Sequence, residues 1–298
     1  MDGFYGVTSW INACLSGFRL EGWDDVEILE LACISRSELK AGYCSFDTYN
    51  RVFKAAVELY GEQAGIVSRR GVILNTFSSF SFATMCAGSV QDALELLVRN
   101  NRSITNGVEF FVTEEDGLTF GFHTNRHCDV HPEVAVGILC AALRVARFVQ
   151  PAGKIIHRAE MAHAEPLCCE GARCYFKAPI SWNENRYALH FCEQAMCGSA
   201  THTNRDLMYQ QELHWLDEAS KFNKVNLLLD IQAFIQQSLS GQDLSIDLAA
   251  QHLGMSVRTL QRRLADESFN FTQLINQAKK NEAQRLVSNS EQSISEAA

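Results

Sequence analysis

The chain has 298 residues and a mass of 33.4 kDa, which is long for one domain and sufficient for two. Hydrophobic residues make up 47% and charged residues 20%, with only 4 prolines and 18 glycines, which excludes a disordered or collagen-like chain. The 26 cationic and 35 anionic side chains give a net charge of −9, which excludes binding of DNA by bulk positive charge but allows a sequence-specific binder with a few cations on one face.

Eleven cysteines are spread between Cys14 and Cys197, and the first residues lack the basic and apolar regions of a signal peptide. The longest apolar run, Val134–Leu143, is about half of the roughly 20 residues that a membrane-spanning helix needs. We therefore expect a cytoplasmic protein, not associated with a membrane, whose reduced cysteines are mainly small core residues.

The first part of the chain predicts two helices and a hairpin. Apolar residues recur every three or four positions over Phe46–Tyr60, which is the helix period. Ser89 is typical of a helix N-cap, and an apolar helical face follows it over Val90–Val98. Two β-rich runs, Val108–Val112 and Leu118–Phe122, are separated by turn residues and predict a hairpin.

A strongly apolar helix is predicted next, from His131-Pro132-Glu133 through Phe148, because proline is favoured at the first helical position. Two further strand-like stretches follow, Lys154–His163 and Tyr175–Phe191, and polar turn residues interrupt the second at 183–185. This order predicts an α+β domain that contains helices and a small antiparallel sheet.

The class of structure changes after Phe191. Residues 198–204 are small and polar and predict the start of a linker, and from Leu207 the pattern is helical almost to the end of the chain. We therefore predict an effector-binding and dimerisation domain over residues 1–205, a helical linker over 206–223 and an all-α domain over 224–298.

The stretch from Leu244 to Leu264 is the most informative part of the chain. Ser245 and Ser256 are typical N-caps of two short helices, and Gly254 between them suits a left-handed turn that a side chain would oppose. Two short helices joined by a glycine-containing turn predict a helix-turn-helix.

The second of these helices has two faces of different character. Leu260 and Leu264, with Val257, can pack on the first helix, whereas arginine and glutamine side chains occupy the opposite row. In the major groove arginine pairs with guanine and glutamine with adenine, and neighbouring polar groups can hold phosphates. The predicted DNA contacts are Ser256, Arg258, Thr259, Gln261, Arg262 and Arg263.

The string from Gly254-Met255-Ser256 through Arg258 to Leu264 resembles the AraC/XylS family of transcription regulators, and so do Ala249, Leu253, Phe271 and Leu274. The upstream region is similar to the arabinose-regulator-type effector domain of one branch of the family, over Ser89–Val98, Val108–Phe122 and Tyr175–Phe191. The resemblance implies a regulator of transcription that is not an enzyme and needs no cofactor. It further implies binding of a small-molecule effector, double-stranded promoter or operator DNA, RNA polymerase and a second copy of the chain.

The family resemblance also implies two helix-turn-helix units joined by a long helix. Phe271–Val287 matches the joining helix, and residues 293–298 resemble the opening of the second unit, so we expect a chain truncated within that unit. Ser268 stands where the family commonly has a glycine. Between Asn226 and Ala298 there are six cations and eight anions, which predicts weak and strongly salt-dependent DNA binding.

A second hypothesis is a metal- or redox-sensing module. The metal candidate is a loop whose imidazole and thiolate groups would suit zinc or iron, formed by His123, His127, Cys128, Asp129 and His131. His131 is more simply explained as the cap of the helix that follows it, and the other members of the loop as solvated side chains. The redox candidate is Cys168-Cys169 with Cys174, but vicinal cysteines without an adjacent cationic patch more often pack or lie in a loop.

The residues identify neither a catalytic site nor the effector. Nucleotide-binding, serine-hydrolase and zinc-protease motifs are missing from the sequence. Five aromatic residues either line an apolar pocket or form an ordinary core, namely Phe77, Phe80, Phe82, Phe110 and Phe120. The family resemblance is compatible with two kinds of effector, a small metabolite or a lipid-like signal.

Overall fold

The computed structural model describes residues 4–72, 76–114, 117–126, 128–151, 153–193, 204–238, 244–253, 255–266, 270–276 and 279. Contacts divide the chain into two units, one over Tyr5–Ser220 and another that contains the residues from Lys221 onward. Within the described ranges, no helix combines the length and apolar composition needed to cross a membrane. The ten described cysteines are all free thiols.

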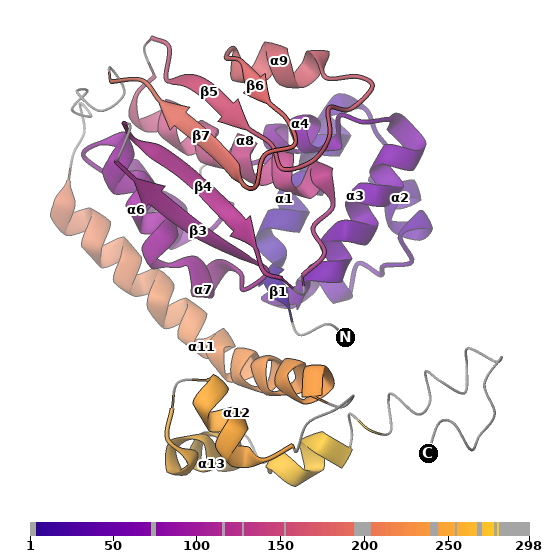
Figure 1. The fold of residues 1–298 in the computed structure, drawn as a ribbon, viewed down its shortest axis with the longest axis vertical. Coiled ribbons are helices and arrows are strands. Elements are labelled where there is room, and N and C mark those ends of the chain that lie inside the picture. Colours follow the sequence, from indigo (N-terminus) through magenta and orange to yellow (C-terminus); the bar gives the residue numbers. More distant parts are fainter. Residues whose placement is uncertain are drawn as a thin grey trace. The chain divides into compact units, whose positions relative to one another are not determined.

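Five strands form the main sheet of the first unit, in the order β3-β4-β7-β5-β6 (Figure 1). The predicted hairpin is confirmed, because β3 (Val108–Thr113) pairs antiparallel with β4 (Thr119–Thr124). On its other side β4 pairs antiparallel with β7 (Tyr187–Phe191), which pairs in the same sense with β5 (Ile156–Glu160). The edge strand β6 (Ile180–Ser181) runs parallel to β5. The α+β class predicted for this part of the chain is therefore confirmed.

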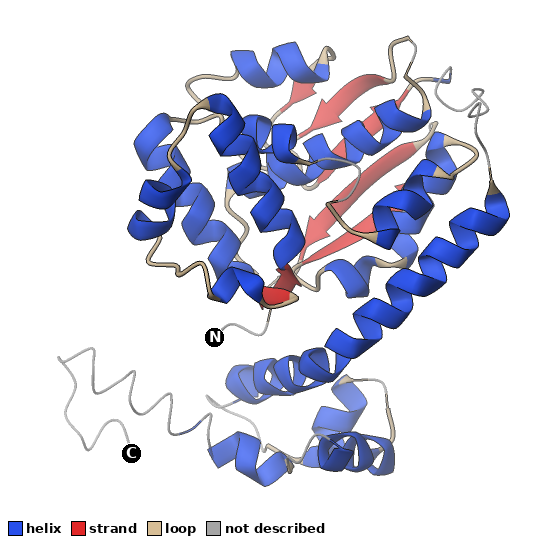
Figure 2. Ribbon diagram, turned by 180° about the vertical axis from the view of Figure 1, so that it is seen from behind, coloured by secondary structure: helices blue, strands red, loops and turns tan. Residues whose placement is uncertain are grey.

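Helices cover one face of this sheet (Figures 1 and 2). Helix α6 (Val90–Arg99) packs on β3, and α8 (Pro132–Val149) packs on β7. Both begin at the predicted caps, since Ser89 Oγ and His131 Nδ1 accept backbone N–H groups at 3.0 and 3.2 Å. The third predicted helix is also confirmed and is α3 (Phe46–Tyr60).

Several elements of the first unit had not been predicted from the sequence. A two-stranded antiparallel sheet joins β1 (Tyr5–Val7) to β2 (Tyr43–Ser45). The additional helices are α1 (Thr8–Glu21), α2 (Asp25–Leu31), η1 (Glu38–Lys40), α4 (Ala64–Ser68), η2 (Arg69–Gly71), α5 (Ser79–Met85) and α7 (Asn101–Ile104).

The prediction of a strand from Tyr175 onward is wrong at its start. Residues Glu170–Phe176 form helix α9, which ends where Lys177 adopts a left-handed conformation with φ of 52°. Ala172 and Phe176 are four residues apart and are both buried, so a helix places them on one face against the core. The strand character of the sequence therefore begins only at β6 and β7.

The second unit is helical, as predicted for this part of the chain. Helix α11 (Arg205–Ser238) includes the predicted linker 206–223, and its residues beyond Lys221 belong to this unit. It is followed by α12 (Ile246–His252) and α13 (Val257–Asp266), and residues 271–276 are also helical. The buried core of the unit consists of Leu227, Ile231, Ile235, Ala249, Ala250, Leu260, Leu264, Phe271 and Leu274.

Some predictions fall on residues outside the described ranges. They are the linker residues 198–203, the left-handed turn at Gly254, the departure at Ser268, and residues 281–298 with the opening of a second helix-turn-helix.

Candidate ligand pocket and nucleic-acid interface

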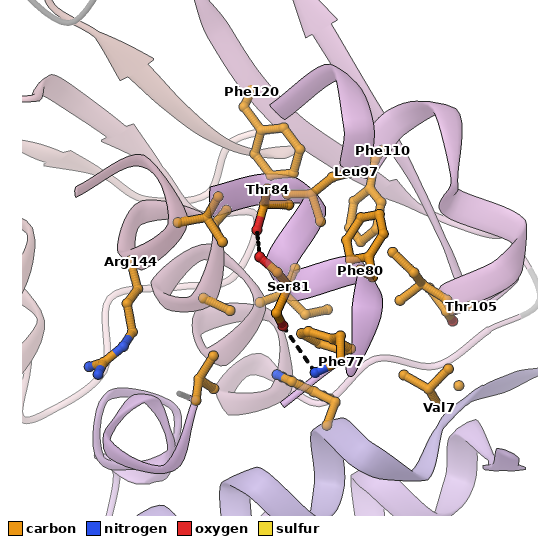
Figure 3. A pocket seen from close by; sticks show the side chains of 18 of the residues that line it. Val7, Phe77, Phe80, Ser81, Thr84, Leu97, Thr105, Phe110, Phe120 and Arg144 are labelled. Carbon is orange, nitrogen blue, oxygen red and sulfur yellow. Dashed lines mark hydrogen bonds between the residues drawn. The ribbon is translucent and has the colours of Figure 1, made fainter. Parts of the chain in front are cut away.

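A cavity of about 750 Å³ lies within the first unit, between the sheet and the helices that cover it. Its volume falls within the range of roughly 300–1,000 Å³ that is typical of small-molecule sites. Strands β3 and β4 contribute Phe110 and Phe120, whose ring centroids are 5.7 Å apart. Phe77, just before α5, and Phe80, within α5, also line the cavity (Figure 3).

Four of the five phenylalanines noted in the sequence line this cavity, but Phe82 does not. Its side chain is 46% exposed, whereas Phe80 is buried. The two residues are two positions apart on α5, and such residues point to different sides of a helix. Of these two phenylalanines, Phe80 therefore lines the cavity and Phe82 lies on the surface.

The hydroxyl groups on the wall are already hydrogen-bonded within the protein. Thr84, Thr105 and Tyr49 each donate to a backbone carbonyl oxygen, at 2.7, 2.6 and 2.7 Å. Ser81 Oγ accepts the backbone N–H of Phe77 at 3.1 Å (Figure 3). These bonds leave mainly ring faces and alkyl groups for contact with a ligand.

Positive charge collects at one border of the cavity. The C-terminal half of α8 places Arg144 and Arg147 there, and Figure 3 shows Arg144 apart from Phe80 and Phe110. The guanidinium groups of Arg69 and Arg147 lie 4.5 and 4.7 Å from the ring centroid of Tyr175, which also lines the cavity. Burial raises the pKa of Tyr175, and the charges of the three arginines oppose that rise.

These three arginines have no carboxylate partner in the described structure. None of the salt bridges between described residues involves Arg69, Arg144 or Arg147. Arg147 Nη2 instead donates to the backbone oxygen of Tyr175 at 2.9 Å. The border of the cavity therefore carries uncompensated positive charge.

The first part of α11 packs next to the wall of the cavity. Trp215 is buried, its ring lies 5.5 Å from the ring of Phe80, and its Nε1 donates to Ser103 Oγ at 2.8 Å. Glu212 is also buried and accepts two hydrogen bonds from Arg99 at 2.7 and 2.9 Å, which hold the pKa of its carboxyl below the usual value.

Sequence reasoning gave Trp215 and Arg144 no role. For Trp215 a signal was present, because Glu212, Trp215 and Ala219 recur at helical spacing and form one buried face. For Arg144 the sequence offered only an arginine within an apolar helix.

The second unit contains the predicted helix-turn-helix helices. Ser245 Oγ accepts the backbone N–H of Leu248 and Ser256 Oγ accepts that of Thr259, both at 3.2 Å, so the two predicted N-caps are confirmed. Leu260 is fully buried in the core of the unit, as the two-faced pattern of α13 predicted.

The opposite face of α13 is open to solvent. Arg258, Gln261, Arg262 and Arg263 are exposed. The hydroxyl group of Thr259 is hydrogen-bonded to that of Ser256 at 2.8 Å. Among the described residues, none of the salt bridges involves an arginine of α13.

The described members of the predicted metal loop have other roles. His123 lies at the end of β4 with its ring 5.0 Å from that of Phe111, Cys128 is buried, and His131 caps α8. His127 lies outside the described residues. Among the side chains that the structure describes, no three His, Cys, Asp or Glu residues are grouped as metal ligands.

The cysteines of the predicted redox site are exposed or half-buried. The thiol of Cys169 donates to Glu165 Oε1 at 3.2 Å, and this hydrogen bond raises the pKa of the thiol. Because the thiolate is the reactive form, this environment disfavours oxidation of Cys169.

Residues 22–196, more than half of the chain, match the family model of the arabinose-binding domain of the AraC transcription regulator, N-terminal. A crystal structure of the transcriptional regulator CdpR from Pseudomonas aeruginosa is similar at 18% sequence identity, over 91% of this chain and 86% of that chain, with a TM-score of 0.45. No curated protein matches the chain. The matched span contains the main sheet, α8 and much of the cavity wall.

Proposed function

Because the chain belongs to the family of AraC transcription regulators that carry an N-terminal arabinose-binding domain, we propose that it is a sequence-specific DNA-binding regulator controlled by a small effector. The cavity of the first unit would hold the effector, and α13 would read DNA. The observation that carries the proposal is the exposed row of arginines on a helix whose other face is buried in a core. Such a regulator is not an enzyme, and we expect it to be cytoplasmic and to act on RNA polymerase.

The residues of α13 divide by the chemistry of their side chains. Arg258, Gln261 and Arg262 have the groups that pair with base edges in the major groove. Ser256, Thr259 and Arg263, at the capped N-terminus and beside this row, suit the phosphate backbone. The exposure of Arg258, Gln261, Arg262 and Arg263 leaves all four side chains accessible to DNA.

A mobility-shift titration of the full chain tests the proposal. We expect higher affinity for the promoter region of its own gene than for random DNA of the same length, and a steep loss of affinity as salt increases, because phosphate contacts release counterions. Equal affinities of the chain for random DNA and for the promoter would contradict sequence-specific recognition.

A homodimer is the expected state of the regulator, and an exposed apolar stripe on α11 supports it. Tyr209, Leu213 and Leu216 are 59, 46 and 42% exposed and recur at helical spacing, beside the face that docks on the first unit. We expect the double substitution Leu213→Glu with Leu216→Glu to convert the dimer to a monomer in light scattering at micromolar concentration.

Leu20→Glu is the matched control for this prediction, because Leu20 is 66% exposed on α1, away from the stripe. This variant should remain a dimer. A monomeric wild-type chain, or a double variant that still dimerises, would show that the stripe is not the interface.

A further inference from the structure

Most of the buried part of the cavity wall is hydrocarbon, apart from the hydroxyl groups of Tyr49, Ser81, Thr84 and Thr105. Phe80, Phe110 and Phe120 are buried around it, with Val7 and Leu97 among their neighbours (Figure 3). Contact with these groups removes apolar surface from water and therefore favours a ligand with an apolar chain or ring.

A sugar does not suit this wall. It would bury several hydroxyl groups, and a buried hydroxyl without a hydrogen-bond partner is unfavourable. The hydroxyl hydrogens of Thr84, Thr105 and Tyr49 are already used on backbone carbonyls. These three groups can accept hydrogen bonds from a sugar but cannot donate to it, so the wall suits a hydrocarbon better than arabinose, the sugar named by the matched family model.

The border of the cavity is cationic and therefore favours an anionic group on the ligand. Arg144 is exposed there, Arg147 is held by its hydrogen bond to the Tyr175 backbone, and Arg69 lies on the Tyr175 ring. A carboxylate matches the fork of donors on a guanidinium group, and such hydrogen bonds are strengthened by charge.

We infer that the effector is an amphipathic monocarboxylate, with its hydrocarbon part against the phenylalanine wall and its carboxylate at Arg144 and Arg147. This inference rests on the proposed function and names the class of its effector. It commits to an anionic head and an apolar body in one molecule.

Isothermal titration calorimetry of the full chain tests the class of ligand without any variant. The probes are dodecanoate below its critical micelle concentration, methyl dodecanoate below its solubility limit, and L-arabinose. We expect dodecanoate to bind at one molecule per chain, at least tenfold more tightly than its neutral methyl ester, and L-arabinose not to bind. From hexanoate to dodecanoate, affinity should rise by up to about fourfold per added methylene, since each buried CH₂ contributes separately.

Two substitutions locate the site. Arg144→Gln should weaken dodecanoate about tenfold and leave the methyl ester unchanged, whereas the control Arg126→Gln, at an exposed arginine outside the lining, should change neither. Ala141→Phe places a ring in the cavity and should abolish binding of both probes, with an unchanged circular dichroism spectrum as the check on folding.

The inference is overturned if the acid and the ester bind equally well, if L-arabinose binds more tightly than dodecanoate, or if folded Ala141→Phe binds dodecanoate like the wild type.

A promoter titration with and without dodecanoate separates this result from the proposed function. Dodecanoate that binds in the cavity without altering promoter affinity supports the ligand class and contradicts control by this effector. Specific promoter binding in a chain that binds no carboxylate leaves the regulator intact and removes the inference.

Discussion

Trp215→Ala is expected to lower the free energy of unfolding of the first unit by about 3–5 kcal/mol, the usual cost of truncating a buried tryptophan. Trp215 is 7% exposed, lies against Phe80 and donates to Ser103. Its removal leaves a void where α11 packs on the unit and leaves Ser103 without that donor. Because Phe80 also lines the cavity, we expect the variant to weaken the effect of any ligand on DNA binding as well.

Intrinsic fluorescence during urea unfolding measures this effect selectively. All four tryptophans of the chain, Trp10, Trp23, Trp182 and Trp215, lie within Tyr5–Ser220, so their emission reports on the first unit and not on the helix-turn-helix. The control Trp215→Phe keeps an aromatic ring beside Phe80 but removes the N–H group, and should cost only about 1–2 kcal/mol. A midpoint for Trp215→Ala that equals the wild-type midpoint would show that α11 does not stabilise this unit.

Arg262→Ala is expected to cost about 1–3 kcal/mol of binding free energy on the specific DNA site and to relax the preference at one base pair. Arg262 is exposed in the middle of α13, one turn beyond Arg258 and beside Gln261, on the side away from buried Leu260 and Leu264. A guanidinium group in this position can reach both acceptors of a guanine. Its removal should leave folding unchanged within about 0.5 kcal/mol, because the side chain is outside the core.

The measurement is the affinity of wild type and Arg262→Ala for specific and scrambled DNA at two salt concentrations. Gln251→Ala is a suitable control, since Gln251 is exposed on α12 and outside the predicted contacts. An equal loss on both DNA sequences, with a salt slope lower by about one, would assign Arg262 to a phosphate instead of a base. Unchanged affinity on both would argue against this face of α13 as the reader of DNA.

Local signals in the sequence determined a substantial part of the structure. The bounds of α3, the caps at Ser89, His131, Ser245 and Ser256, and the β3–β4 hairpin all follow from residues a few positions apart. Capping hydrogen bonds and helical periodicity involve residues within one or two turns of each other, so both can be predicted from the sequence alone. The two-faced character of α13 follows from the same periodicity.

Tertiary packing decided the features that distant segments build together. The sequence could not separate Phe80 from Phe82, because only the packing of α5 turns one to the cavity and the other to solvent. Likewise Tyr175 belongs to a helix because Ala172 and Phe176 share a buried face there, although its neighbours read as a strand.

The ligand site depends on packing to the greatest extent. Arg69, Arg144 and Tyr175 come from η2, α8 and α9, and no spacing in the sequence relates them. The contact of Trp215 with Phe80 joins residues 135 positions apart in the chain. A cavity with an apolar wall and a cationic border exists only once the sheet and its helices have packed, because its chemistry is the sum of side chains that meet in space and not along the chain.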